Sequence, residues 1–203
     1  MIYKQSKKQS FTNWIKIVRG FFGKGICPYQ FSFILDSPLR RFILSPNRLA
    51  DRLHLKPYFN VLEIGPGSGY FSIEVARRIP QGHLELFDLQ QEMLEKVKHK
   101  IKSTGLHNVS FTKGDAINLP FGENSFDVVF LVSVLGEVPD PRVCLQSIYR
   151  VLKPAGLLSI TEQPGDPDFL PLSIIRLMAE EEGFSLIEIY GKRKNYTVNF
   201  KKS

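Results

Sequence analysis

The sequence predicts a single α/β domain built on a mostly parallel sheet. From Asn60 onwards, short apolar runs typical of buried strands alternate with amphipathic helical patterns, and this alternation indicates right-handed βαβ units. A glycine-rich loop follows the first of these strands, and the last two strand patterns are joined too closely to be parallel. At 203 residues, the chain is long enough for one such domain with a full core.

The apolar periodicity predicts each element in turn. Five strands are expected in the first part of the domain: 60–64, 83–88, 108–113, 127–132 and 157–162. Helical patterns lie in three of the intervals: 71–79, 92–101 and 143–152. A helix over 171–182 then leads to strands 184–190 and 196–201, which a short basic turn joins. The expected sheet therefore has seven strands and ends in an antiparallel C-terminal hairpin strand.

Residues 1–56 are expected to form a helical N-terminal extension to a domain that spans 57–203. Ser37 and Ser45 each precede a proline, and a serine N-cap followed by proline at the first helical position is typical of a helix start. They predict two short helices, near 38–44 and near 46–54.

An apolar stripe lies upstream, among basic residues. Its members recur at helical spacing: Trp14, Ile15, Val18, Phe21 and Phe22. Three roles stay open for this stretch. It is a lid over a substrate pocket, a peripheral contact of residues 11–24 with an anionic membrane surface, or an apolar face packed on the domain.

The charge is distributed unevenly. Residues 1–35 and 189–203 hold eleven of the 27 basic residues and no acid, so the 16 that remain share 36–188 with all 20 acids. A nucleic-acid-binding domain usually spreads its basic face over the fold, which argues against a nucleic-acid partner. Cys27 and Cys144 have neither disulfide-scaffold nor zinc-ligand spacing, and this suits a reducing compartment. We therefore expect a cytoplasmic protein, with peripheral membrane contact open.

The glycine-rich loop indicates a ligand. Gly65, Gly67 and Gly69 follow the first strand, and glycine lets a ligand lie against the backbone at the start of a helix. A dinucleotide fingerprint would end on a small residue at position 70, where this chain has Tyr70, so a pyrophosphate loop is disfavoured. Glu63, before the first glycine, suits a ligand with an ammonium group.

Two further acids follow the next two strands. Asp88 ends the second strand, where a carboxylate accepts both hydroxyls of a ribose. Asp115 follows the third strand and can accept from the exocyclic amine of a base. Three strand ends with a carboxylate at each match an adenosine ligand that carries a positively charged amino-acid arm.

From about Asn60 to Ser203, the chain resembles class I S-adenosylmethionine-dependent methyltransferases, in the branch called methyltransferase type 11. The matching blocks are VLEIGPGSGY, FDLQQEML, GDAINLPF, SFDVVFLVSVLGEVPDP and RVLKPAGLLSITE. The segment CPYQFSFILDSPLRRFILSPNRLADRL also resembles the front portion of uncharacterised bacterial members. The resemblance implies a Rossmann-like three-layer sandwich with S-adenosylmethionine as cofactor.

The resemblance also implies roles for individual residues. Glu63 would face the methionine amino group, Asp88 would take the ribose hydroxyls, and Asp115 would take the adenine amine. The other cofactor-binding residues would be Gly65, Pro66, Gly67 and Gly69 beside the methionine and ribose, Leu89 and Ala116 beside the adenine, and Val132 and Ser133 under the sulfonium.

Glu137 is the candidate catalytic residue, because it follows the fourth strand, where the acceptor enters in relatives. It would orient or deprotonate a substrate hydroxyl or amine. The alternatives are a carboxylate that caps the next helix or pairs with Arg40 or Arg41. Arg40 and Arg41 would either bind an acidic substrate or be solvated or paired with nearby acids. The four histidines show no metal-ligand spacing, so the sequence indicates no metal site.

Methyl transfer from a sulfonium mainly requires that the protein holds donor and nucleophile in line and excludes water. The chain lacks the Asn/Asp-Pro-Pro-Tyr tetrad after the fourth strand, which argues against the usual nitrogen acceptors. We expect a methyltransferase that acts on a small molecule, with a lipophilic one favoured by family analogy. The alternative is a catalytically silent regulatory or membrane-associated protein that binds the cofactor.

Overall fold

The structure is a computed structural model and describes residues 44–203. Four expectations lie outside the described residues: the apolar stripe, the helix near 38–44, the arginines Arg40 and Arg41, and Cys27. Cys144 is described and is fully buried, as expected of a structural thiol.

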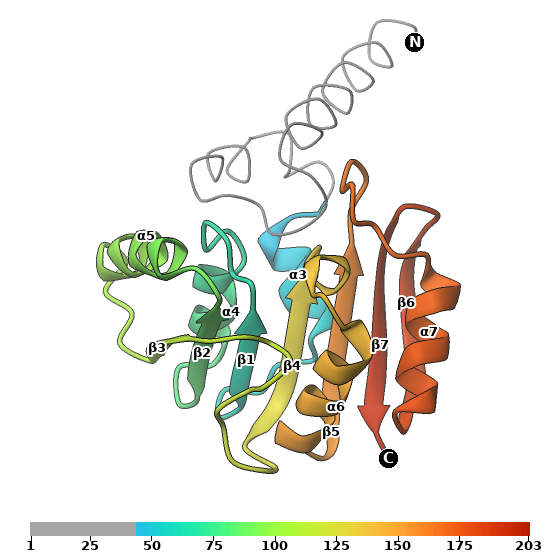
Figure 1. The fold of residues 1–203 in the computed structure, drawn as a ribbon. Coiled ribbons are helices and arrows are strands. Elements are labelled where there is room, and N and C mark those ends of the chain that lie inside the picture. Colours follow the sequence, from blue (N-terminus) through green and yellow to red (C-terminus); the bar gives the residue numbers. More distant parts are fainter. Residues whose placement is uncertain (1–43) are drawn as a thin grey trace, which may run out of the picture.

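A seven-stranded sheet forms the middle layer of the domain (Figure 1). In spatial order its strands are β3 (Val109–Lys113), β2 (His83–Asp88), β1 (Asn60–Ile64), β4 (Phe126–Val132), β5 (Leu152–Glu162), β7 (Asn195–Lys202) and β6 (Phe184–Lys192). The first five run parallel, whereas β7 is antiparallel to both β5 and β6. The expected mostly parallel sheet with an antiparallel C-terminal hairpin strand is confirmed.

Helices cover both faces of the sheet, so the domain has three layers (Figure 1). One face carries α3 (Pro46–Arg52), α4 (Ser72–Arg78) and α5 (Gln91–Lys102). The other carries α6 (Pro141–Val151) and α7 (Leu172–Glu181). Neighbouring residues of β1 serve opposite faces, because Val61 packs in the core under α4 and Leu62 in the core under α6. Burial on both faces explains the continuous apolar run of this strand.

The start of α3 agrees with the Ser-Pro signal, because the Ser45 side chain accepts a hydrogen bond from the backbone N–H of Arg48 at 3.3 Å. The start of β5 differs from the expectation. The strand begins at Leu152, where the helix was expected to end, and not at 157. Leu152 pairs with Phe126 of β4, but the register shifts before the next pair, Val128 with Leu157, and Ala155 in this irregular stretch has a positive φ of 63°. Regular pairing with β4 therefore begins at Leu157, the expected start of the strand.

The carboxyl ends of β1 to β5 meet at one edge of the sheet, at the top of Figure 1. The glycine loop, the acids after β2 and β3, and the loops after β4 and β5 all leave from this edge. Within residues 44–203, no helix is long and apolar enough to cross a bilayer.

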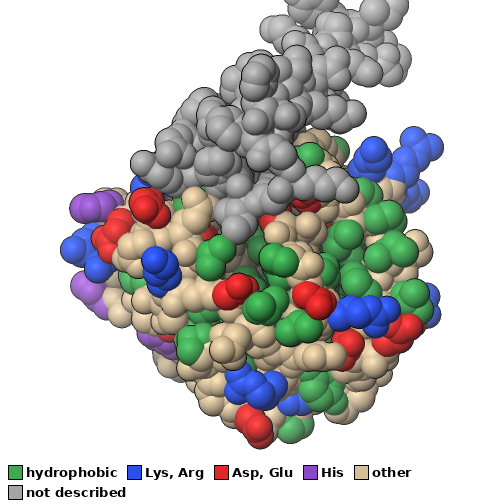
Figure 2. All heavy atoms as spheres, viewed as in Figure 1, with side chains coloured by type: hydrophobic (Ala, Val, Ile, Leu, Met, Phe, Trp, Pro, Cys, Tyr) green, Lys and Arg blue, Asp and Glu red, His purple; other side chains and the backbone are tan. Residues whose placement is uncertain are grey.

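The basic residues at the end of the chain are not gathered on one face. Lys192 to Lys194 lie at the β6–β7 turn, and Figure 2 shows basic side chains there, at the upper right of the view. Lys202 lies at the opposite end of β7, and its ammonium group donates to the carbonyl oxygen of Leu152 at 2.7 Å.

Candidate functional site

The glycine loop connects β1 to α4 through three residues with positive φ. Gly65, Gly67 and Gly69 have φ angles of 68°, 56° and 72°, which disfavour any residue with a Cβ. Packing imposes a second requirement at Gly65, because an added Cβ would lie 2.5 Å from a methyl carbon of Val134. The N–H of Gly69 donates to the carbonyl oxygen of Pro66 at 2.9 Å, which closes the turn.

Glu63 lies next to last in β1 and is 3% exposed. The hydroxyl of Ser72, the first residue of α4, donates to its carboxylate at 2.6 Å. This contact fixes Glu63 beside the glycine loop. Ser72 was not predicted from the sequence as a site residue. Its position as a polar residue at the start of the helix after the glycine loop could have indicated this role.

Asp88 is the last residue of β2 and is 9% exposed. Burial raises the pKa of its carboxyl group to about 6, while hydrogen bonds from the backbone of Gln90 and Leu89 partly offset the rise. The Gln90 N–H donates to Asp88 Oδ1 at 2.9 Å. The backbone of Asp88 also accepts from the N–H of Gly114 at 3.0 Å, which joins the end of β2 to the end of β3.

The third acid, Asp115, is exposed and follows Gly114. Its Oδ1 accepts from the backbone N–H of Ile117 at 3.1 Å, so the side chain is held by its own loop. Ala116 beside it is buried, whereas Leu89 after β2 is 43% exposed. The carboxyl edge therefore offers an exposed apolar side chain near two acids.

The end of β4 carries local strain. Val132 is buried, and Ser133 has a positive φ of 56°, which is unusual for a residue with a side chain. The Ser133 N–H donates to the carbonyl oxygen of Thr161 in β5 at 2.8 Å. Its hydroxyl is buried and has no hydrogen-bond partner among the described residues. An unpaired polar atom in a strained backbone is typical of a binding site.

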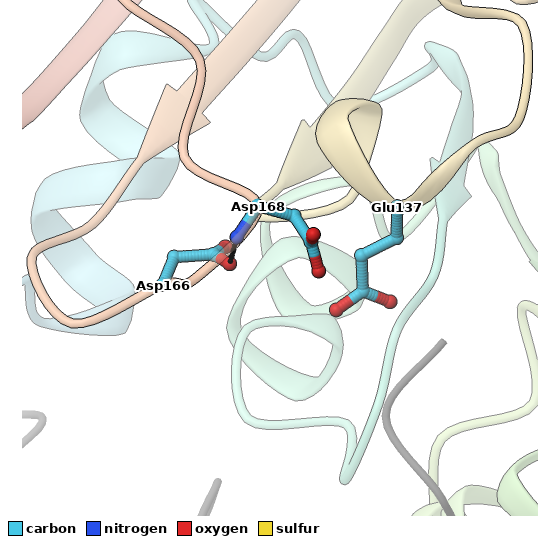
Figure 3. Close-up of side chains that lie close together, drawn as sticks. All are labelled: Glu137, Asp166 and Asp168. Atoms are coloured by element: carbon cyan, nitrogen blue, oxygen red, sulfur yellow. Dashed lines mark hydrogen bonds between the residues drawn. The ribbon is translucent and has the colours of Figure 1, made fainter. Parts of the chain in front are cut away.

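Glu137 ends the short 3-10 helix η2 (Leu135–Glu137), just after β4. It does not cap the next helix, because Asp140 does so by accepting from the backbone N–H groups of Arg142 and Val143. Glu137 instead points toward Asp166 and Asp168 (Figure 3). One carboxylate oxygen from each of the three residues lies within 4.8 Å of the others. The sequence analysis did not anticipate this cluster.

Glu162, the last residue of β5, lies close to the cluster and is 1% exposed. In the part of the chain that the structure describes, neither of its carboxylate oxygens has a partner in a well-formed hydrogen bond. Burial raises the pKa of Glu162 to about 8; the charges of Asp166, Glu137 and Asp168 add to the rise, and the backbone of Leu170 offsets part of it. Glu162 was not predicted as a site residue, although an acid at the end of a parallel strand is a sequence feature that indicates one.

The structure thus brings the glycine loop and the acids of β2 and β3 together along one edge, and places Ser133 and Glu137 after the neighbouring strand β4. A family model for a methyltransferase domain matches residues 55–182. A demethylmenaquinone methyltransferase from Listeria welshimeri is 42% identical over 111 residues, which are 53% of this chain and 47% of that protein. The chain spans about half the length of the curated relatives it matches.

Solved structures share the fold. A SAM-dependent methyltransferase from Aquifex aeolicus has a TM-score of 0.81 at 22% identity, over 88% of this chain and 100% of that one. The cyclase SpnF has a TM-score of 0.69 at 20% identity, over 77% of this chain and 79% of that one. These two likenesses show the fold alone, and the cyclase is a reminder that one fold serves several reactions. The family model, which spans more than half of the chain, shows that this protein belongs to the class I S-adenosylmethionine-dependent methyltransferases.

Proposed function

We propose that this chain transfers the methyl group of S-adenosylmethionine to a small, lipophilic acceptor. The observation that carries the proposal is the row of acids beside the glycine loop at the carboxyl edge of β1, β2 and β3: Glu63, Asp88 and Asp115. The cofactor presents an ammonium group, two ribose hydroxyls and an exocyclic amine. All of these are donors, and carboxylates are their matching acceptors.

In this proposal Glu63 faces the ammonium group, Asp88 accepts from the ribose hydroxyls, and Asp115 accepts from the adenine amine. Leu89, which is exposed here, packs on the adenine. The remaining contacts come from Gly65, Pro66, Gly67 and Gly69 in the loop, Ala116 after β3, and Val132 and Ser133 after β4. The Ser133 hydroxyl fits this placement, because a ligand would supply the hydrogen-bond partner that residues 44–203 do not provide.

When bound, the cofactor supplies a methyl group already activated by the sulfonium. The acceptor nucleophile forms a bond to the methyl carbon as the carbon–sulfur bond breaks, the sulfur keeps that electron pair, and the acceptor loses a proton. The chain has to align the two reactants and exclude water. Glu137, on the loop after β4, is the residue we propose to orient the acceptor or take its proton.

The acceptor class that we propose is a lipophilic quinone. The curated relatives are named as demethylmenaquinone methyltransferases, and the sequence similarity covers about half of this chain. We also propose that residues 11–24 contact an anionic lipid surface, where such an acceptor is dissolved. Their apolar residues recur at helical spacing among Lys16, Arg19 and Lys24.

Two experiments test the function. In titration calorimetry, the full chain should bind S-adenosylmethionine and S-adenosylhomocysteine but not NAD. With a labelled methyl donor, it should then label reduced demethylmenaquinone in detergent micelles. The protein could bind both compounds and yet transfer no label to this acceptor or to a total lipid extract. That result would overturn methyl transfer and leave a silent cofactor-binding protein. No binding would overturn the cofactor assignment itself.

The membrane contact needs a separate test. Deletion of residues 1–26 should leave cofactor binding intact and reduce co-sedimentation with vesicles that contain phosphatidylglycerol. The matched control is the same deletion with neutral phosphatidylcholine vesicles, to which neither protein should bind strongly. Equal binding of the full and shortened chains to anionic vesicles would contradict the proposal.

A further inference from the structure

Glu137, Asp166 and Asp168 form an acidic cluster (Figure 3), and none of them is among the residues proposed to hold the cofactor. Glu137 comes from the loop after β4, and the two aspartates come from the loop between β5 and α7. All three side chains are partly buried, and one oxygen of each lies within 4.8 Å of the other two. Negative charge is therefore concentrated where the loops after β4 and β5 meet.

The backbone holds these two loops in contact. An added Cβ at Gly136 would lie 1.8 Å from the carbonyl oxygen of Asp168, so only glycine permits this approach. Within the second loop, the Asp168 N–H donates to Asp166 Oδ1 at 2.9 Å. The main chain thus holds the two loops that carry these acids close together.

Glu162 supplies an independent observation that indicates a ligand. It is 1% exposed, and within residues 44–203 neither of its carboxylate oxygens has a partner in a well-formed hydrogen bond. Among the described residues, the charged groups that act on it are the three acids of the cluster, and their interactions with an ionised Glu162 are repulsive. Burial of a carboxyl group without hydrogen bonds is unfavourable, because the group loses its contacts with water and gains none in return. A cation bound among these residues would remove that cost.

The spacing of the oxygens fits one metal ion. Two oxygens on the same ion are separated by at most twice the metal–oxygen distance, which is about 4.2 Å for Mg²⁺ and about 4.6–5.2 Å for Ca²⁺. The separations within 4.8 Å therefore suit Ca²⁺ directly and Mg²⁺ after a small inward movement. All of the candidate ligands are carboxylate oxygens, which bind hard divalent cations.

We propose that Glu137, Asp166 and Asp168 bind a hard divalent cation, with the buried carboxyl group of Glu162 close to them. The role of this ion rests on the proposed function. Next to the end of β4, it would bind an oxygen of the acceptor and lower the pKa of an acceptor hydroxyl, which then loses its proton to water more readily. With the ion bound, Glu137 would orient the acceptor through the ion and would not itself take the proton. The sequence analysis found no metal-ligand spacing because these ligands come from separate loops that only the fold brings together.

The direct test is metal binding by the full chain, without any methyl transfer. The protein is treated with EDTA, dialysed and titrated with Mn²⁺, and free Mn²⁺ is counted by electron paramagnetic resonance. We expect one saturable site per chain, with Mg²⁺ and Ca²⁺ as competitors that identify the preferred ion. No saturable site below about 1 mM, the weak end of protein calcium sites, would overturn the proposal.

Matched variants locate the site. Glu137→Gln and Asp168→Asn should each weaken Mn²⁺ binding by about tenfold or more, since even outer-shell partners of metal ligands contribute about 10–100-fold. Glu95→Gln removes an exposed carboxylate on α5 and should leave the affinity unchanged. Circular dichroism and S-adenosylmethionine binding check that the variants fold, and Glu162→Gln serves as a further variant should one of them fail. Wild-type Mn²⁺ affinity in the folded cluster variants would overturn the assignment.

The metal site and the proposed methyl transfer can be overturned independently of each other. Mn²⁺ binding without methyl transfer to any tested acceptor would leave the metal site standing and overturn the function. Undiminished methyl transfer by the EDTA-treated protein, together with no Mn²⁺ site, would leave the function standing and overturn the metal site.

Discussion

The backbone N–H of Gly65 donates a hydrogen bond to the carbonyl oxygen of Phe87 at 2.8 Å. Phe87 directly precedes Asp88, so this bond ties the start of the glycine loop to the acidic end of β2. The Gly114 N–H, bonded to the carbonyl oxygen of Asp88, continues the connection to β3. The groups proposed to hold the cofactor are therefore positioned by the sheet before any ligand binds, and such preorganisation lowers the entropic cost of binding.

The first prediction concerns Asp88. Asp88→Ala should weaken S-adenosylmethionine binding by about 1–3 kcal/mol, because charge-assisted hydrogen bonds to the ribose are lost. Titration calorimetry measures the change, and Glu95→Ala, which removes an exposed carboxylate on α5, serves as the control. Unchanged affinity in the Asp88 variant would contradict the placement of the ribose.

The second prediction concerns pH. Because burial raises the pKa of Asp88 from 3.8 to about 6, and the ribose is best held by the carboxylate, cofactor affinity should rise between about pH 5 and pH 7. The stability of the cofactor-free protein should change in the opposite direction. The folded state holds the Asp88 proton more tightly than the unfolded state, so this contribution is fully present below about pH 4 and is lost as the pH rises through about 6.

Asp88→Asn should remove both pH effects, because the amide does not titrate. Calorimetry at several pH values checks the affinity, and urea unfolding at the same values checks the stability. A pH profile of cofactor affinity that is identical in the variant and the wild type would show that another group controls it.

The third prediction separates two requirements of the glycine loop. Gly65→Ala introduces backbone strain and a clash with Val134, whereas Gly105→Ala introduces similar strain at φ 72° with no atom within 4 Å. Gly105→Ala should lower the free energy of unfolding by about 1–2 kcal/mol. Gly65→Ala should lower it by about 1–3 kcal/mol more. Urea unfolding measures both, and equal losses would show that packing against Val134 contributes nothing.

The fourth prediction concerns Ser72, whose hydroxyl holds Glu63. Ser72→Ala should weaken S-adenosylmethionine binding by about 1–2 kcal/mol, because Glu63 loses the donor that orients it. Ser125→Ala removes a hydroxyl that donates to Gly122 in an exposed turn, and it should leave the affinity unchanged. If the two serine variants bind the cofactor equally well, Ser72 does not position Glu63 for binding.

The parts of the site that lie in continuous motifs could be predicted from the sequence. Gly65 to Gly69 follow β1 directly and Asp88 ends β2, and parallel strands bring such ends to one edge. The helix and strand positions could also be predicted, because the apolar periodicity that indicates them is local in the sequence. The first residues of β5 were not predicted, because the pairing of Leu152 with Phe126 of β4 precedes an irregular stretch and depends on the tertiary fold.

The acidic cluster could not be predicted in this way. Its formation depends on the approach of Gly136 to the backbone of Asp168, a contact between loops that no residue spacing reveals. The burial of Glu162 and the charges around it also result from tertiary packing, because they depend on residues from several elements. Ser72 belongs to the same group, because its role depends on how α4 packs against β1.

The most direct test of the central claim is a crystal structure of the full chain with S-adenosylhomocysteine. We expect the ribose hydroxyls within hydrogen-bonding distance of the Asp88 carboxylate, the amino group near Glu63 and the adenine amine near Asp115. A ligand bound elsewhere on the protein, or an adenosine that leaves all three carboxylates without contact, would contradict the account.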